Sequence, residues 1–253
     1  MSTHSTDGLA IREGVDQLKL QRIGLFAGCI GLGLYAGALV LANLVIPTPP
    51  DWSAAQITDR IVDENFRIRL GCALGTLAAV LMLPFFAAIA QRIARIERKF
   101  GMLSLTAAMT MLLNVVGLIY PLVVLVAATY RAGHRSDEIN QAFDDLFWLM
   151  FLSVIGPVAL ESILLAIATF LDPKPVPTFP RWFGYFNLWT AATAIPGCLL
   201  LLVPDGPMSW NGVLGYWIPA TDFTVWTYVT AVVLLRSIQA DRASGISRHH
   251  VPN

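Results

Sequence analysis

Two acidic residues of this 253-residue chain, Glu161 and Asp222, fall deep inside long apolar stretches. A charged side chain at the centre of a bilayer costs about 2.5–3.5 kcal/mol on an insertion scale, so such a carboxyl group faces a cavity, finds a partner or stays protonated. Asn114, Thr190 and Thr193 are available as partners in other apolar stretches. We take Glu161, Asp222 and Asn114 as a candidate intramembrane polar site, which serves either proton exchange or structural hydrogen bonding.

A second candidate group consists of charges near the ends of two apolar stretches. Asp144 and Asp145 come early in one stretch, and Arg67 and Arg69 lead into another. If the two helices are neighbours, arginine can bind a carboxylate through two parallel hydrogen bonds and form an ion-pair cluster at the outer face. The alternative is that each side chain simply extends to water. Consecutive helical residues point about 100° apart, so the two aspartates do not easily act on one atom.

The sequence offers no arrangement that predicts a catalytic site, a metal or a cofactor. Its histidines and lysines all lie outside the apolar stretches, which argues against an intramembrane haem, a di-iron centre or a retinal-type Schiff base. The chain contains no GxxxxGK[ST], HExxH or GxSxG motif. The histidines outside the apolar stretches are His4, His134, His249 and His250, and the lysines are Lys19, Lys99 and Lys174.

Apolar helices must position the candidate residues. The chain is 56% apolar and 13% charged, against about 25% charged residues in an ordinary soluble domain. A membrane-spanning helix needs about 20 apolar residues. We therefore predict an all-α polytopic transmembrane bundle that forms a single membrane domain over residues 1–253, with short polar termini at 1–20 and 236–253. The approximate spans, about six in number, are 23–46, 69–90, 101–129, 143–171, 182–203 and 212–235.

The distribution of lysine and arginine predicts the orientation of these spans. Of the 17 basic residues, twelve fall on the side that holds both termini and five on the other side, so the positive-inside rule places both termini in the cytoplasm. We expect a location in the plasma membrane. The 17 acidic residues bring the net charge to zero, which gives no electrostatic basis for binding nucleic acid.

Local patterns indicate how the helices begin, bend and pack. Ser53 followed by Gln56 has the form of a capping box, and the helix that it opens would bury Ile57 and Ile61 on one face. This helix either lies on the membrane, caps the bundle or leads into the second span. Glycine pairs spaced by four allow close helix contacts, and prolines inside five spans predict kinks. The glycine pairs are Gly24 and Gly28, Gly33 and Gly37, and Gly71 and Gly75; the prolines are 84, 121, 157, 196 and 219.

Three functional hypotheses follow. The first is a non-enzymatic protein that either belongs to a larger membrane complex or binds a lipid or an apolar ligand; its partners would be the bilayer, other membrane subunits or a second copy of the chain. The second is a small proton-coupled transporter, which requires Glu161 and Asp222, or one of them with Asn114, to line one water-accessible space. The third is an intramembrane lipid-modifying enzyme, which an outer pocket joining Asp144 or Asp145 to Arg67 would favour.

Overall fold

The computed structural model describes residues 3–174 and 177–248, which form helices and loops and no strand. The prediction of an all-α fold is confirmed. Short helical turns η1, η2, η3 and η4 cover Ala132–His134, Ile195–Leu201, Gly206–Met208 and Val213–Trp217. The α-helices are α1 Thr3–Leu41, α2 Ala54–Asp63, α3 Asn65–Val80, α4 Leu83–Glu97, α5 Met102–Thr129, α6 Asp137–Leu152, α7 Ile155–Leu171, α8 Arg181–Ala194 and α9 Ile218–Arg248.

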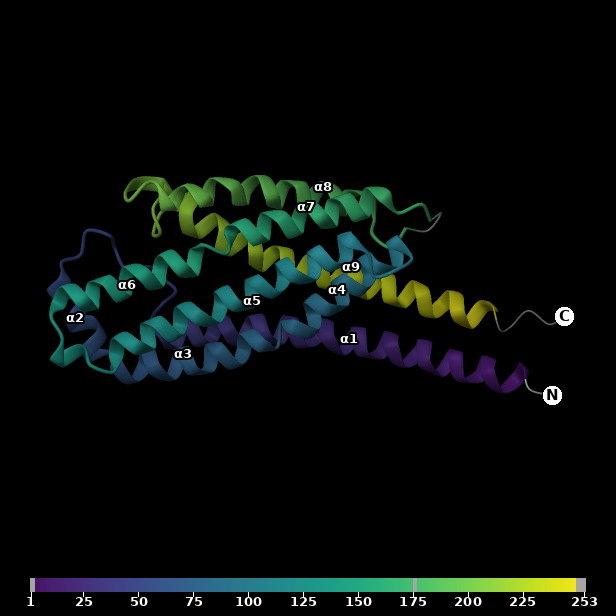
Figure 1. The fold of residues 1–253 in the computed structure, drawn as a ribbon, viewed down its shortest axis with the longest axis horizontal. Coiled ribbons are helices and arrows are strands. Elements are labelled where there is room, and N and C mark those ends of the chain that lie inside the picture. The colour runs from purple at the N-terminus through teal and green to yellow at the C-terminus, as the bar shows by residue number, and fades with distance from the viewer. Residues whose placement is uncertain (1–2, 175–176, 249–253) are drawn as a thin grey trace.

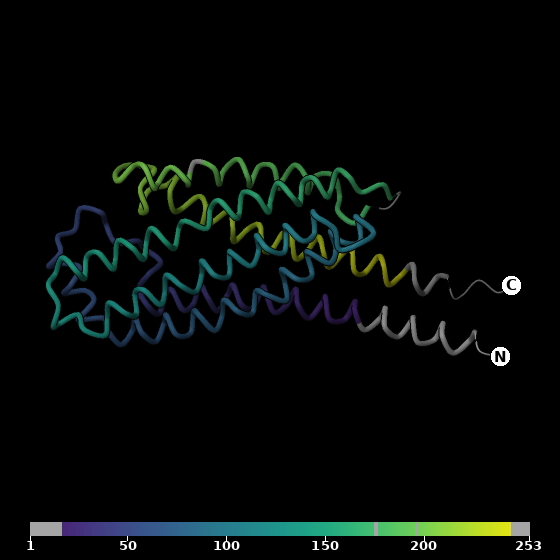
Figure 2. Tube along the Cα trace, viewed as in Figure 1, coloured from purple at the N-terminus to yellow at the C-terminus, as the bar shows by residue number. Residues whose placement is uncertain are grey.

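The helices form one elongated bundle in which the chain runs repeatedly from end to end (Figure 1). α3 with α4, and α6 with α7, each make one interrupted passage, and Figure 2 shows the continuous trace through these breaks. α1 begins and α9 ends at the same end of the bundle, which we call the terminal end. The opposite end holds α2 and is called the loop end. The polar termini are thus largely helical, since α1 starts at Thr3 and α9 reaches Arg248.

Five helical segments are long and apolar enough to cross a membrane, which fits a membrane protein. Predicted span 182–203 is not among them, because α8 has only 14 residues before the chain tightens into the 3₁₀-helix η2. A sixth crossing is therefore not confirmed. The five segments are Gln17–Leu41, Asn65–Glu97, Met102–Thr129, Asp137–Leu171 and Gly206–Ala243.

Prolines lie at most of the helix interruptions. Pro84 occupies the first turn of α4 and Pro157 the first turn of α7, each just after a break. Pro219 follows the π-helical turn η4 at the start of α9. Proline lacks an amide hydrogen and clashes with the preceding turn, so the first turn of a new helix is the position that tolerates it best. Pro121, in contrast, lies inside the continuous helix α5.

Small residues let α1 lie close to α3 and α4. A Cβ atom at Gly28 would collide with Phe85, and one at Gly71 would lie 2.6 Å from the Cβ atom of Ala42. These glycines therefore occupy helix contacts, as their spacing predicts. Gly37 differs, because a Cβ atom there would meet nothing within 4 Å.

The short helix α2 caps the bundle at the loop end. The predicted capping box is present: the Ser53 amide donates to the Gln56 side chain at 2.9 Å, and the Gln56 amide donates to the Ser53 hydroxyl. Ile57 and Ile61 are buried in a small apolar cluster with Ala128 of α5. A break at Glu64 separates α2 from α3, so α2 is more than a lead-in to the second span.

Candidate functional site

Glu161 is sealed inside the bundle with Asn114 as its hydrogen-bond partner. Asn114 of α5 donates from Nδ2 to Oε2 of Glu161 on α7 at 2.6 Å. Glu161 is 0% exposed, and its other oxygen, Oε1, has no hydrogen-bond partner. Asn114 is 1% exposed, and its Oδ1 atom is likewise unpartnered. The contact joins two helices, and it leaves one buried acceptor on each side chain unused.

Asp222 lies in a different setting. The Thr193 hydroxyl of α8 is 2.9 Å from Asp222 Oδ2 on α9. The same hydroxyl is 3.0 Å from the carbonyl oxygen of Thr190, so its single hydrogen is not committed to Asp222. Asp222 is only partly buried. No hydrogen bond joins Asp222 to Glu161 or Asn114 among the described side chains, so the structure separates the two predicted carboxyl groups.

A cavity of about 150 Å³ connects these two settings. Asn114 and Asp222 both line it, whereas Glu161 does not. The rest of the lining is mainly apolar, with side chains from α1, α5, α6, α7, α8 and α9 and an aromatic portion from Phe151, Tyr216 and Phe223. Asn114 and Asp222 thus line one space, which the transport hypothesis requires of Asn114 and one carboxyl group together with access for water.

Helix interruptions surround this cavity. Its lining includes Leu152 and Ile155 on either side of the break between α6 and α7, and Ala194 at the end of α8. Pro219 contributes the first turn of α9. Because backbones that bend or restart cannot pack as continuous cylinders, the space between them is filled less completely than between regular helices.

The predicted outer-face cluster is arranged differently from the expectation. Asp144 is paired with Arg60 of α2, with 3.8 Å between Oδ1 and NH1. Arg67 instead contacts Glu64 at 3.6 Å, and the Arg69 guanidinium lies over the ring of Tyr130 at 4.5 Å. None of the ion pairs among the described residues joins Arg67 or Arg69 to Asp144 or Asp145.

Arg60 is therefore a residue that sequence reasoning missed at the loop end. It donates to the Thr48 hydroxyl at 2.6 Å and to the Asn43 carbonyl at 2.8 Å. Trp148 of α6 also donates to that Thr48 hydroxyl, at 3.1 Å. The available signal was on α6, where Asp144 lies three and four residues before two buried aromatic residues and so shares the buried face. This spacing indicates that Asp144 has its partner inside the fold.

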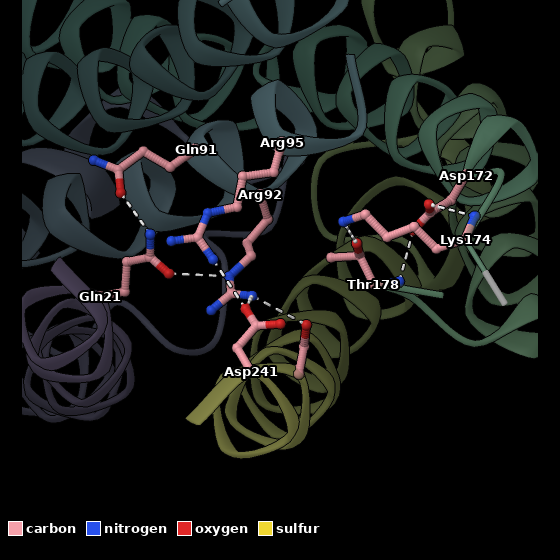
Figure 3. Close-up of polar contacts among 9 residues, drawn as sticks. Gln21, Gln91, Arg92, Arg95, Asp172, Lys174, Thr178 and Asp241 are labelled. Atoms are coloured by element: carbon pink, nitrogen blue, oxygen red, sulfur yellow. Dashed lines mark hydrogen bonds and ion pairs between the residues drawn. The ribbon is translucent and has the colours of Figure 1, made fainter. Parts of the chain in front are cut away.

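A second missed cluster joins α1, α4 and α9 near the terminal end (Figure 3). Arg92 is 1% exposed, forms an ion pair with Asp241, and donates to Gln21 at 3.0 Å and to Ser237 at 3.2 Å. Arg95 binds the same Asp241 oxygen at 2.9 Å. In the sequence, both arginines were only two of the twelve basic residues that predict the orientation of the spans. The signal was again helical spacing, since Arg92 shares one stripe with the buried isoleucines 89, 93 and 96.

No protein-family model, no curated protein and no solved structure matches this chain. Among residues 3–174 and 177–248, no three His, Cys, Asp or Glu side chains are grouped so that they could hold a metal ion. The chemistry of the site is set by the side chains that face the cavity. They provide a mainly apolar volume whose polar lining residues are Tyr35, Asn114, Tyr216, Asp222 and Thr224.

Proposed function

We propose that the chain crosses the membrane six times with both termini in the cytoplasm. α1 begins and α9 ends at the same end of the bundle, and a chain whose ends share one side crosses an even number of times (Figure 1). Five segments qualify by length and hydropathy, so α8 with η2 supplies the remaining crossing. The excess of basic residues on the terminal side supports a cytoplasmic location for that end.

Within that topology, the protein binds a small apolar ligand, or one end of a lipid chain, in the central cavity. The observation that carries this proposal is the mainly apolar cavity of about 150 Å³ among the broken helices. An engineered apolar cavity of about 150 Å³ in a soluble protein stays dry and binds benzene. Of the leading hypotheses, a subunit of a complex or a binder of an apolar ligand, the cavity favours the second.

Access from the lipid phase supports this function. Ala36 of α1 and Ala220 and Thr224 of α9 line the cavity and are also exposed on the surface of the bundle. The cavity therefore reaches the surface between α1 and α9, where the bilayer would supply apolar molecules directly. A site with this placement is typical of ligand pockets between helices of a bundle.

Binding of 4-fluorotoluene to the protein in phosphatidylcholine nanodiscs, followed by ¹⁹F NMR, tests the proposal. We expect a saturable bound signal in addition to the signal from lipid-dissolved probe. Ala194→Leu should remove it, because Ala194 is 3% exposed and lines the cavity, so a larger side chain occupies that space.

Ala192→Leu is the matched control, because Ala192 lies on the same helix, is exposed and does not line the cavity. It should leave the bound signal unchanged. A wild-type signal no different from that of nanodiscs without protein, or equal loss in both variants, would contradict the function.

Proton-coupled transport is the second candidate, favoured by the shared position of Asn114 and Asp222 on the wall of one cavity. Transporters build midplane sites from interrupted helices, and the interruptions here surround the same space. In sealed proteoliposomes holding a pH-sensitive dye, transport would appear as substrate-dependent acidification that Asp222→Asn abolishes.

Lipid modification at the outer face has less support, because Asp144 pairs with Arg60 rather than with Arg67.

A further inference from the structure

The polar side chains on the cavity wall offer the cavity acceptors and almost no donors. Three of them are hydroxyl groups, and each has already given its hydrogen to a backbone carbonyl. The bonds run from Tyr35 to Leu118 at 2.9 Å, from Tyr216 to Val45 at 2.8 Å and from Thr224 to Ala220 at 2.8 Å. A hydroxyl has a single hydrogen, so only its oxygen lone pairs remain for a ligand.

Asn114 and Asp222 continue this pattern. Asn114 lines the cavity but donates from Nδ2 to Glu161, and its Oδ1 atom is buried without a partner. Asp222 supplies a carboxylate, which accepts hydrogen bonds only when it is ionised. Pro219, the neighbouring lining residue on α9, has no amide hydrogen to offer.

The described residues that line the cavity carry negative charge and no positive charge. Asp222 is acidic, and none of the described residues that line the cavity is a lysine, arginine or histidine. A buried acceptor without a donor is destabilising, and an unpaired carboxylate in an apolar setting is more so. A ligand that brings hydrogen-bond donors and a positive charge would offset the cost at Asp222.

From these contacts we infer that the cavity binds a small amphipathic amine, with its ammonium group at Asp222 and its apolar body against Phe151 and Tyr216. The inference rests on the proposed ligand-binding function and specifies its ligand class. Aromatic ring faces are also favourable neighbours for an ammonium group. The volume suits an apolar body about the size of a benzene ring. A longer apolar chain would extend out of the cavity between α1 and α9.

Three probes that share a 4-fluorophenyl ring separate the head group from the apolar body. They are 4-fluorobenzylamine, 4-fluorobenzyl alcohol and 4-fluorotoluene, each titrated by ¹⁹F NMR at neutral pH into protein in zwitterionic phosphatidylcholine nanodiscs. We expect the amine to bind about tenfold more tightly than 4-fluorotoluene, which corresponds to one charge-assisted hydrogen bond. The alcohol should bind more weakly than the amine, since it donates without carrying charge.

The variants Asp222→Asn and Asp145→Asn complete the test. Asp222→Asn should remove the advantage of the amine, which is its tighter binding relative to 4-fluorotoluene. The variant should still bind 4-fluorotoluene, and this binding shows that it is folded. Asp145→Asn makes the same change at a partly buried carboxyl group away from the cavity wall and should preserve the advantage.

Two results would overturn the amine inference: an amine that binds no more tightly than 4-fluorotoluene, or an advantage that survives Asp222→Asn. Both leave the proposed function standing if 4-fluorotoluene still binds and Ala194→Leu blocks it. If none of the three probes shows saturable binding, the proposed function and the inference fail together.

Discussion

Glu161 and Asp222 are the same kind of residue in the same kind of apolar sequence, yet the fold gives them opposite surroundings. Glu161 is 0% exposed and lies 2.6 Å from an amide on the neighbouring helix. Asp222 is partly buried, lines a cavity and has only a hydroxyl whose hydrogen can also bond a backbone carbonyl. An acidic residue in a membrane helix is therefore not by itself a site, and what it faces decides whether it can act on a ligand.

The strongest test of this contrast is chemical access from the lipid phase. Dicyclohexylcarbodiimide is an apolar reagent that adds to the carboxylic acid form and leaves a stable N-acylurea. We expect modification at Asp222 and none at Glu161, measured by mass spectrometry of peptides after brief exposure in nanodiscs. Ala194→Leu should slow the reaction at Asp222, because it narrows the cavity. Labelling of Glu161 at the same rate would break the contrast.

The second test compares the partners of the two carboxyl groups. Asn114→Leu removes the donor from a fully buried carboxyl group and should lower the free energy of unfolding by about 1–3 kcal/mol. Thr193→Val, its counterpart at Asp222, should cost less than about 1 kcal/mol because its hydroxyl hydrogen is shared with a backbone carbonyl. Thermal unfolding in one detergent measures both variants, and equal losses would show that burial does not separate the two sites.

The ion-pair cluster at the terminal end also combines a buried charged residue with an exposed one. Arg92 is 1% exposed and Asp241 is 44% exposed. Asp241→Leu leaves the buried Arg92 without its carboxylate and should cost about 1 kcal/mol, a value reduced by the exposure of Asp241. Arg95→Met removes the outer arginine, which is 38% exposed, and should have little effect on the same melting curve. A larger loss for Arg95→Met would contradict the importance of Arg92 burial.

The smallest expected effect belongs to Glu161→Gln. A glutamine oxygen can still accept from Asn114, so the change in unfolding free energy should stay below about 1 kcal/mol and probe binding should not change. The matched Asp222→Asn variant should also fold, yet alter the choice between amine and neutral probes. Loss of probe binding in Glu161→Gln would show that the sealed carboxyl group takes part in recognition and would erase the contrast.

Periodicity and composition predicted where the helices lie better than they predicted which helices contact one another. The capping box at Ser53 is present because it involves residues three apart in sequence. Five of the six predicted spans correspond to helices of sufficient length and hydropathy. The span predicted at 182–203 was not confirmed, because a hydropathy pattern does not show that the helix at Ala194 tightens into a 3₁₀-helix.

The candidate site was predicted residue by residue but not as an arrangement. Asn114 was expected as one of several partners, and the structure assigns it to Glu161. Arg67 and Arg69 were candidates to pair with Asp144 if their helices were neighbours, and Arg60 lies there instead. A position near the end of an apolar stretch does not give the direction in which a side chain points.

The sequence by itself determined that this chain forms apolar helices and that acidic groups occur within them. These properties depend on residue type and on spacing within one turn, which the chain specifies locally. Only the tertiary structure decided that Asn114 and Asp222 share a cavity while Glu161 does not, and that Arg92 meets Asp241 149 residues away. Such pairings depend on the rotation and adjacency of whole helices, and these are fixed by the packing of all helices together.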